Sequence, residues 1–204
     1  MATFNTPFEM TKRAIDSVLN QDFQDFELIV IDDGNSSVES KRLLDYISDY
    51  DDKISFLRHK NRGQSNSINR GIGLCNSTYI CIIDADDEYK SNHLTTCINA
   101  MQENDLIATH TDTIVDKMED YYVPDKHNNS SHIHVDDCIL FATLFGKAEV
   151  FKNIVFENKY AADSYFFEAA SKVYNVSKLA TRTYVYYRNN QHSLTAKMKN
   201  TKNL

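Results

Sequence analysis

Three carboxylates follow one apolar run in this sequence: Asp84, Asp86 and Asp87 come directly after the segment TYICII. Because like charges repel at such short spacing, a fold that holds them at one strand end needs a cation or many hydrogen bonds to compensate. A hard divalent ion is an economical solution, since an Asp-x-Asp pair supplies two oxygen ligands and leaves positions for phosphate oxygens and water. Mn²⁺ or Mg²⁺ held in this way would act as a Lewis acid on a leaving diphosphate. The alternative is a solvated turn or a helix cap, where Asp is also common.

A second acidic pair, Asp32 and Asp33, ends another apolar run, FELIVI, and precedes Gly34. Each run is short and rich in β-branched residues, which is typical of a strand buried on both faces. Segments with helical periodicity alternate with these strands along the chain. Helices are predicted at about 7–20, 37–48 and 63–75, and strands at about 26–32, 54–59 and 78–84.

This alternation, with short connections, predicts an α/β fold in which a mostly parallel sheet carries helices on both faces. Ligands of such open sheets bind beyond the carboxyl ends of the strands. Both acidic clusters are predicted at such ends, so we expect them to converge on one crevice.

The first helix is predicted to begin with Thr6 as N-cap, Pro7 at the first helical position and Glu9 three residues after the cap. Only MATFN precedes that cap, although a buried parallel strand is expected there. The first strand is therefore stunted, either because it is cut short or because the true start lies upstream of Met1.

The composition limits the function classes. Lys plus Arg number 22 and Asp plus Glu number 29, and the formal net charge is −7. This balance argues against a nucleic-acid-binding protein whose affinity depends on neutralising phosphates. The four cysteines form no C-x-x-C pair, which favours buried side chains in a reducing compartment over a disulfide framework. No apolar run reaches about 18 residues, so we expect no transmembrane segment and a cytoplasmic protein; association with the inner face of the membrane through partners stays open.

The pattern changes from about residue 113. The stretch 113–137 is polar and has no clean period, so it is interpreted as a long excursion or loop that could serve as an active-site lid. Beyond it, YAADSYFFEAASKVYNV has helical spacing and LATRTYVYYRN is typical of a strand.

The ordered series ATFN, SVLNQDFQDFELIVIDDGNSS, NRGQSNSINRGI and TYICIIDADDEY resembles the nucleotide-binding half of the family 2 glycosyltransferases with the GT-A fold. The segment LFGKAEVFKNIVFENKYAADSYFFEAA resembles the acceptor side of that family, and YYRNNQHSLT resembles its closing segment. The resemblance implies one domain, in which residues 1–112 form the nucleotide-sugar half and residues 113–204 form the acceptor and catalytic-base half.

The resemblance also implies roles for individual residues. Asp33 matches the carboxylate that accepts a hydrogen bond from uracil, although an ordinary Asp-Gly turn is the alternative. Asp84 and Asp86 match the metal and ribose motif, with Asp86 the better candidate for direct coordination, and His192 could complete the metal shell or lie on the surface. Asp87 is either an additional ligand or a cap for the segment that follows. The implied nucleotide contacts are Thr3, Asn5, Asp32, Asp33, Asn61, Asn69, Asp84 and Arg188, the last of which could instead form a surface salt bridge.

Asp163 matches the catalytic base of the family. Independently, an Asp on a predominantly apolar helix is costly to bury unless it is functional or paired, and the alternative is an N-cap for the run that starts at Ser164. Two departures from the family pattern are Ala162, where a Glu is common, and Ile68, where an Arg is common. Arg62 or Arg70 could supply the missing cation.

These patterns predict a metal-dependent, inverting glycosyltransferase that uses Mn²⁺ or Mg²⁺. It would move a sugar from a nucleoside diphosphate, expected to be UDP, to a hydroxyl of a glycan or a lipid-linked acceptor. The alternative is a truncated or degenerate domain that binds a nucleotide sugar without turnover. A nucleotidyltransferase is disfavoured, because ATFNTPFEM has no Gly-rich, basic loop that could hold a triphosphate.

Overall fold

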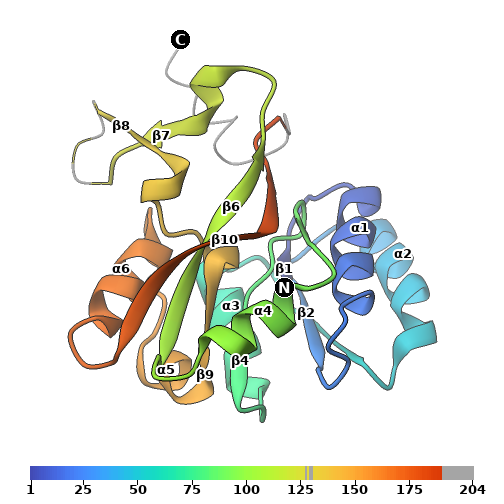
Figure 1. The fold of residues 1–204 in the computed structure, drawn as a ribbon. Helices are drawn as coiled ribbons and strands as arrows, with labels where there is room; N and C mark the ends of the chain where they lie inside the picture. Colours follow the sequence, from blue (N-terminus) through green and yellow to red (C-terminus); the bar gives the residue numbers. More distant parts are fainter. Residues whose placement is uncertain (127, 129–130, 190–204) are drawn as a thin grey trace.

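A computed structural model describes residues 1–126, 128 and 131–189 of the chain. Its first half forms a parallel sheet in the order β1-β2-β3, and three helices connect or follow these strands (Figure 1). The strands are β1 (Ala2–Thr3), β2 (Leu28–Asp32) and β3 (Ile54–Arg58), and the helices are α1 (Phe8–Leu19), α2 (Ser37–Ile47) and α3 (Gln64–Leu74). The β-α-β-α-β order predicted from the sequence is confirmed here.

A second sheet contains five strands in the order β4-β9-β6-β10-β5 and is mixed. Only β6 and β10 run parallel in it, and the other neighbouring pairs are antiparallel. Its strands are β4 (Tyr79–Cys81), β5 (Glu88–Tyr89), β6 (Leu106–Ile114), β9 (Leu144–Lys147) and β10 (Val176–Tyr187), and its helices are α4 (His93–Ala100), α5 (Ala148–Asn153) and α6 (Ala162–Ala170). The parallel arrangement predicted for the sheet therefore holds in the first half and gives way to mixed pairing in the second.

The start of α1 differs from the prediction. The helix begins at Phe8, Pro7 occupies the cap position, and no side chain caps it. The predicted N-cap, Thr6, is therefore wrong by one residue. Pro7 still fits this place, because it lacks the N–H that a helix terminus leaves unpaired.

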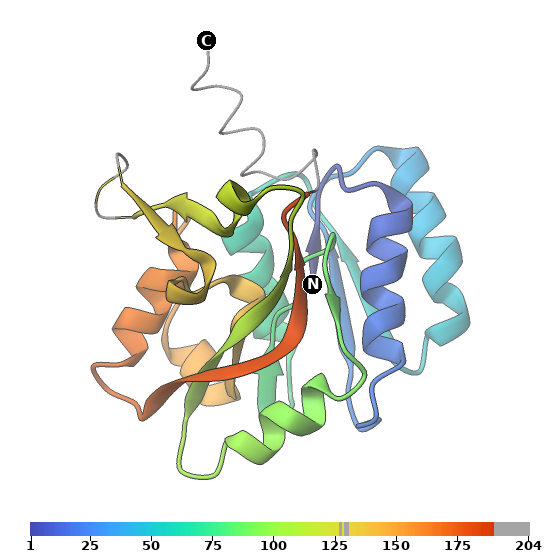
Figure 2. The ribbon, with the colours of Figure 1, turned by 45° about the horizontal axis from the view of Figure 1, so that its top comes forward.

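The stretch 113–137 is more structured than the predicted loop. It contains two short 3₁₀ turns, η2 (Met118–Tyr121) and η3 (Val135–Asp137), and an antiparallel hairpin of β7 (Tyr122–Pro124) and β8 (His132–His134). Figure 2 shows this hairpin on the same side of the molecule as α6 and away from α1 and α2. The Tyr160 hydroxyl, in the segment before α6, donates a hydrogen bond of 3.1 Å to the Pro124 carbonyl and links the two.

The hydrophobic core includes one cluster against each of the two larger sheets. One apolar cluster packs α3, α5 and α6 against the second sheet and contains a stack of Phe151, Phe156 and Phe166, with the last two ring centroids 4.1 Å apart. A second cluster packs α1 and α2 on the first sheet and includes Tyr184, which is fully buried on β10. In the described part of the chain, no helix is long and apolar enough to cross a bilayer.

Replacing Gly34 by Ala should destabilise the protein by about 3 kcal/mol. Gly34 has φ of 92°, and an added Cβ would lie 2.6 Å from the backbone nitrogen of Asn61. The matched control is Gly73→Ala in α3, where an added Cβ meets nothing within 4 Å. That change should stabilise the protein by about 0.5–1 kcal/mol, because Ala is the better helix former. Urea denaturation of both variants measures the difference, and equal effects would contradict the strain assigned to Gly34.

Candidate functional site

The two acidic strand ends lie on either side of β1. Thr3 pairs with Asp32 on β2, and Ala2 forms an isolated parallel bridge with Asp84 on the other side. Because neighbouring strands are about 4.8 Å apart, the two acidic loops leave the sheet about 10 Å from each other. The two acidic clusters thus emerge at the same edge, as the strand order predicted.

Asp32 organises the loop that follows β2. Its side chain is fully buried, and its carboxylate accepts hydrogen bonds from the Gly34 amide at 3.0 Å, from the Asn35 amide at 2.8 Å and from the Ser40 hydroxyl. Asn35 in turn donates to the Thr3 carbonyl and accepts from the backbone amide of Asn5, which has a positive φ of 53°. The structure therefore assigns Asp32 to shaping the loop that carries Thr3 and Asn5, rather than to a surface that a ligand could reach.

Asp33 connects that loop to the segment before α3. Its carboxylate accepts hydrogen bonds from the Arg62 amide at 2.7 Å, the Gly63 amide at 3.0 Å and the Asn61 side chain at 3.2 Å. The Nδ1 atom of the His59 ring also lies 3.4 Å from an Asp33 oxygen, and Asp33 is 2% exposed, so groups of the protein surround its carboxylate. The predicted nucleotide residues Asp33 and Asn61 thus contact each other.

Asp84 lies at the centre of the second acidic cluster. Burial raises the pKa of Asp84 well above its usual range, and the charges of Asp87, Asp86 and Asp163 raise it further. The charge of the Met1 amine partly offsets this shift, and the Gln64 side-chain amide donates to the Asp84 carboxylate at 2.8 Å, but the repulsion among the neighbouring carboxylates remains. A cation placed here would relieve this repulsion.

Asp87 is tied to the last strand of the second sheet. Its side chain is 1% exposed, and its two oxygens accept hydrogen bonds from the Tyr184 hydroxyl at 2.5 Å and from the Tyr187 amide at 2.8 Å. Burial and the charge of Asp86 raise the pKa of Asp87 to about 7. Both oxygens thus bind β10, a structural role that differs from the two alternatives considered for this residue from the sequence.

Asp163 lies in the first turn of α6, after Ala161, which has a positive φ of 55°. Burial raises the pKa of the Asp163 carboxyl to about 6, while hydrogen bonds from backbone amides, including that of Ser164 at 2.8 Å, partly offset the shift. Because its charge acts on Asp84, the carboxylate lies within electrostatic reach of the second acidic cluster. A carboxylate with this pKa is mostly ionised at neutral pH and can accept a proton.

Two predicted ligand contacts have other partners in the structure. Asn69 uses both ends of its amide on the backbone of Phe156, at 2.7 and 3.0 Å, and so joins α3 to the segment before α6. Arg188 is 8% exposed and donates to the carbonyls of Asp120 and Tyr122, at 3.0 and 3.3 Å. Arg188 therefore holds the 113–137 stretch to the end of β10. His192, the third proposed metal ligand, lies outside the described residues.

The structure also shows where Ile68, which stands where the family commonly has an Arg, and the two candidate replacement arginines lie. Ile68 is buried in the core against the second sheet, while Arg62 and Arg70 are exposed. Among the described residues, the cations that act on the acidic cluster are others. One is Arg13 of α1, whose guanidinium donates to the backbone carbonyl of Asp86, and another is the N-terminal amine of Met1, whose charge lowers the pKa of Asp84.

Sequence reasoning missed Arg13, Gln64, Tyr184 and Tyr187. Arg13 is 73 residues from its partner Asp86, and Tyr184 is 97 residues from Asp87. No local spacing relates residues so far apart. The one available signal was the position of Gln64, which follows Gly63 at the predicted start of a helix facing the acidic loop.

The donor set of the second cluster fits a hard divalent ion. Among the described residues, no three His, Cys, Asp or Glu side chains form a group that could hold a metal by themselves. Asp84 and Asp86 would supply two carboxylates, and a cation would offset both the burial and the neighbouring negative charges that raise the pKa of Asp84. Two protein ligands completed by phosphate oxygens and water are typical of Mg²⁺, and oxygen donors also suit Mn²⁺.

Comparisons with known proteins identify relatives of this chain. The family model described as glycosyl transferase family 2 matches residues 1–162. Among curated proteins, the GalNAc(5)-diNAcBac-PP-undecaprenol beta-1,3-glucosyltransferase of Campylobacter jejuni is 34% identical over 103 residues, which are 50% of this chain and 33% of that protein.

Solved structures with a similar fold include S. aureus TarS 1-349 in complex with UDP-GlcNAc, with a TM-score of 0.74 and 16% identity over 96% of this chain and 59% of that one. Another is the mannosyltransferase PcManGT from Pyrobaculum calidifontis in complex with GDP-Man and Mn²⁺, with a TM-score of 0.68 and 14% identity over 98% of this chain and 62% of that one. The aligned part of this chain thus spans less than two thirds of each of these relatives.

Proposed function

Because this chain belongs to glycosyl transferase family 2 and has the GT-A fold, we propose that it is a metal-dependent, inverting glycosyltransferase. The observation that carries the proposal is the acidic loop at the sheet edge, where Asp84 and Asp86 lie together and within electrostatic reach of Asp163. In this proposal, residues 1–112 bind the donor and residues 113–204 supply the acceptor side and the base.

The donor is proposed to be a UDP-sugar. TarS and PcManGT, which share the fold, were solved with UDP-GlcNAc and with GDP-Man and Mn²⁺. Asp33, beside β1, is proposed to accept a hydrogen bond from an N–H such as the one that uracil presents, in place of the contact with the His59 ring at 3.4 Å. Thr3 and Asn5 would bound the same pocket through the loop that Asp32 organises.

The metal would be held by Asp84 and Asp86, together with oxygens of the diphosphate. When bound, Mn²⁺ or Mg²⁺ stabilises the negative charge that develops on the departing diphosphate. Asp87 contributes by holding the acidic loop to β10.

Asp163 is proposed as the general base. It removes the proton from the acceptor hydroxyl as that oxygen forms a bond to the anomeric carbon. The bond from the anomeric carbon to the diphosphate oxygen breaks at the same time, and the electron pair leaves with the nucleoside diphosphate. The attack from the face opposite the leaving group inverts the anomeric configuration. The acceptor is a hydroxyl of a glycan or of a lipid-linked saccharide.

A second candidate function is a nucleotide-sugar-binding domain without turnover. It is favoured by the internal partners of Asn69 and Arg188, which leave these two predicted contacts engaged within the protein. Ala162 in place of the common Glu points the same way. Release of UDP from a UDP-sugar distinguishes the two functions, because a domain that only binds releases none.

Thermal unfolding with UDP, GDP, CDP and dTDP, each with and without Mn²⁺, tests the proposal directly. A ligand present at about 100 times its dissociation constant stabilises the folded state by about 2.7 kcal/mol, which raises Tm by about 5–10 °C for a chain of this size. We expect such a shift for UDP only when Mn²⁺ is present. No shift for any pair would overturn both the donor and the metal assignments.

The stabilisation by Mn²⁺ and UDP should increase as pH rises from about 5.5 to about 8. Burial raises the pKa of Asp84 well above its usual value, so protons compete with the cation for this carboxylate at the lower pH. Without metal, carboxyls with a raised folded-state pKa contribute most stability below their ordinary pKa, and this contribution is lost as pH rises towards about 7. The gap between the metal-bound and metal-free Tm should therefore widen with pH, and a constant gap would contradict the assignment.

A further inference from the structure

Arg13, on α1, contacts the acidic loop of residues 84–88. One terminal nitrogen of its guanidinium donates to the backbone carbonyl of Asp86, and its Nε lies 3.8 Å from a carboxylate oxygen of Glu88. That Nε is buried and forms no hydrogen bond within the described part of the chain. The guanidinium is thus held against the loop by its hydrogen bond to the Asp86 carbonyl, while its ion pair with Glu88 is long.

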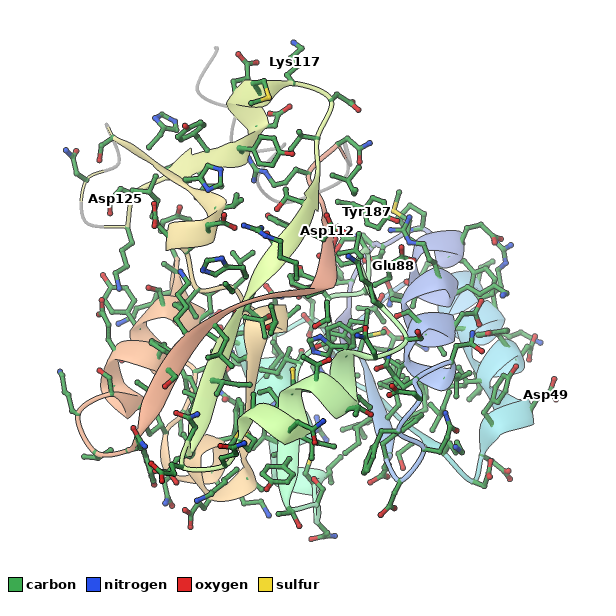
Figure 3. The ribbon with its side chains drawn as sticks, viewed as in Figure 1. Asp49, Glu88, Asp112, Lys117, Asp125 and Tyr187 are labelled. Atoms are coloured by element: carbon green, nitrogen blue, oxygen red, sulfur yellow. The ribbon has the colours of Figure 1, made fainter. Side chains whose placement is uncertain are left out.

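The same guanidinium stacks on the end of β10. Its central carbon lies 3.8 Å from the centroid of the Tyr187 ring, a distance typical of a cation–π contact. Tyr187 also donates its hydroxyl to Glu88 at 2.6 Å and its amide to Asp87 at 2.8 Å. Figure 3 shows Tyr187 and Glu88 together beside α1. The loop at 84–88 is therefore held between α1 and the end of β10.

We propose that Arg13 is a positioning residue for the carboxylates that would hold the metal. By holding the carbonyl of Asp86, it sets the backbone of the residue that is the best candidate for direct coordination. By stacking on Tyr187, it also couples this loop to the C-terminal end of β10. The inference rests on the proposed function, because it assigns Arg13 to the metal and donor site of that function.

The direction in which Mn²⁺ affinity changes when Arg13 is replaced distinguishes a positioning role from a purely electrostatic one. Arg13 carries a positive charge close to a cation site, and its charge lowers the pKa of Asp87. If charge were its only contribution, removing it would tighten the binding of Mn²⁺ by reducing repulsion. If positioning dominates, removing it weakens binding, because the loop loses the contact that orients Asp86.

Isothermal titration with Mn²⁺ alone and, separately, with UDP at saturating Mn²⁺ tests this inference on variants shown to be folded by circular dichroism. The direction of the change distinguishes the two roles in the titration with Mn²⁺ alone. Arg13→Met keeps the length of the side chain and removes the guanidinium, and we expect its dissociation constant to rise about tenfold. Arg13→Lys keeps the charge without the planar group, and we expect an intermediate rise of about threefold. A charge-only role predicts that Arg13→Lys equals the wild type.

Lys12 provides the matched control. It is the preceding residue on α1, pairs with Asp16 at 2.5 Å and lies over the ring of Tyr46 on α2. Lys12→Met removes the same charge from the same helix and should change the dissociation constant by less than about twofold, since surface charges are screened. This control separates the position of Arg13 from the net charge of the helix.

Two variants of Tyr187 test the coupling independently of Arg13. Tyr187→Phe keeps the ring under the guanidinium and should retain most of the affinity, whereas Tyr187→Leu removes the aromatic face and should weaken Mn²⁺–UDP binding in the same direction as Arg13→Met. Unchanged or tighter binding in Arg13→Met, with a wild type that binds, would overturn the inference alone. A wild type that binds no Mn²⁺–UDP would overturn the proposed function and the inference with it. If Arg13→Met does not fold, the two Tyr187 variants decide.

Discussion

Replacing Asp86 by Asn should abolish the Mn²⁺-dependent part of the thermal stabilisation by UDP. The change keeps the shape of the side chain and removes the charge that would bind the cation. Because the Asp86 carbonyl, and not its carboxylate, accepts the hydrogen bond from Arg13, the loop should keep this contact. The expected loss is the whole shift of about 5–10 °C that Mn²⁺ and UDP produce in the wild type.

The control for this variant is Asp49→Asn, in the short turn η1 (Ser48–Tyr50) after α2. Asp49 is exposed and lies far from Glu88 and Tyr187 in Figure 3. The Asp49→Asn change removes one negative charge outside the acidic loop, so the Mn²⁺-dependent shift in Tm should be retained. A Mn²⁺-dependent shift that survives in Asp86→Asn would show that other residues hold the metal.

Replacing Asp163 by Asn should reduce sugar transfer by about a hundredfold to ten-thousandfold, because a general base contributes about that much. Binding of UDP with Mn²⁺ should be retained, since the proposed nucleotide and metal contacts lie elsewhere. The measurement is the rate of UDP release from a UDP-sugar, with water or added glycosides as the acceptor. Loss of release together with loss of UDP binding would indicate a structural defect instead of a missing base.

The pH dependence of the same reaction gives a second test of Asp163. Burial raises the pKa of Asp163 to about 6, and a base must be ionised to accept a proton. At saturating Mn²⁺ and UDP-sugar, the rate should therefore rise as pH increases through about 6 and level off above it. Glu157→Gln, on the exposed segment before α6, should leave both the rate and its pH profile unchanged. A profile without this rise in the wild type would argue against a carboxylate base.

The structure explains why the two halves of the chain would depend on each other. Asp87 binds Tyr184 and Tyr187 of β10, and Arg188, the next residue, holds the 113–137 stretch through the carbonyls of Asp120 and Tyr122. One series of contacts thus connects the acidic loop, the end of β10 and the 113–137 stretch. A change in any of them would be transmitted to the proposed metal site.

The sequence by itself determined the order of the elements and the places where the carboxylates leave the sheet. Alternating apolar runs and helical periods predicted the first sheet, because these patterns depend on burial and on the geometry of each element alone. The acidic ends of β2 and of the segment after β4 were visible for the same reason. The resemblance to the family then supplied the GT-A fold, which the comparisons confirm.

Only the tertiary structure decided which of these polar groups stay available. Asp32 and Asn69 have the residue types of ligand contacts, yet their hydrogen bonds are used inside the protein. The mixed pairing of the second sheet was also hidden, since strand neighbours there are far apart in sequence. Arg13 reaches the acidic loop across 73 residues. Such contacts are made when elements pack, and a local pattern carries no information about which distant groups will meet.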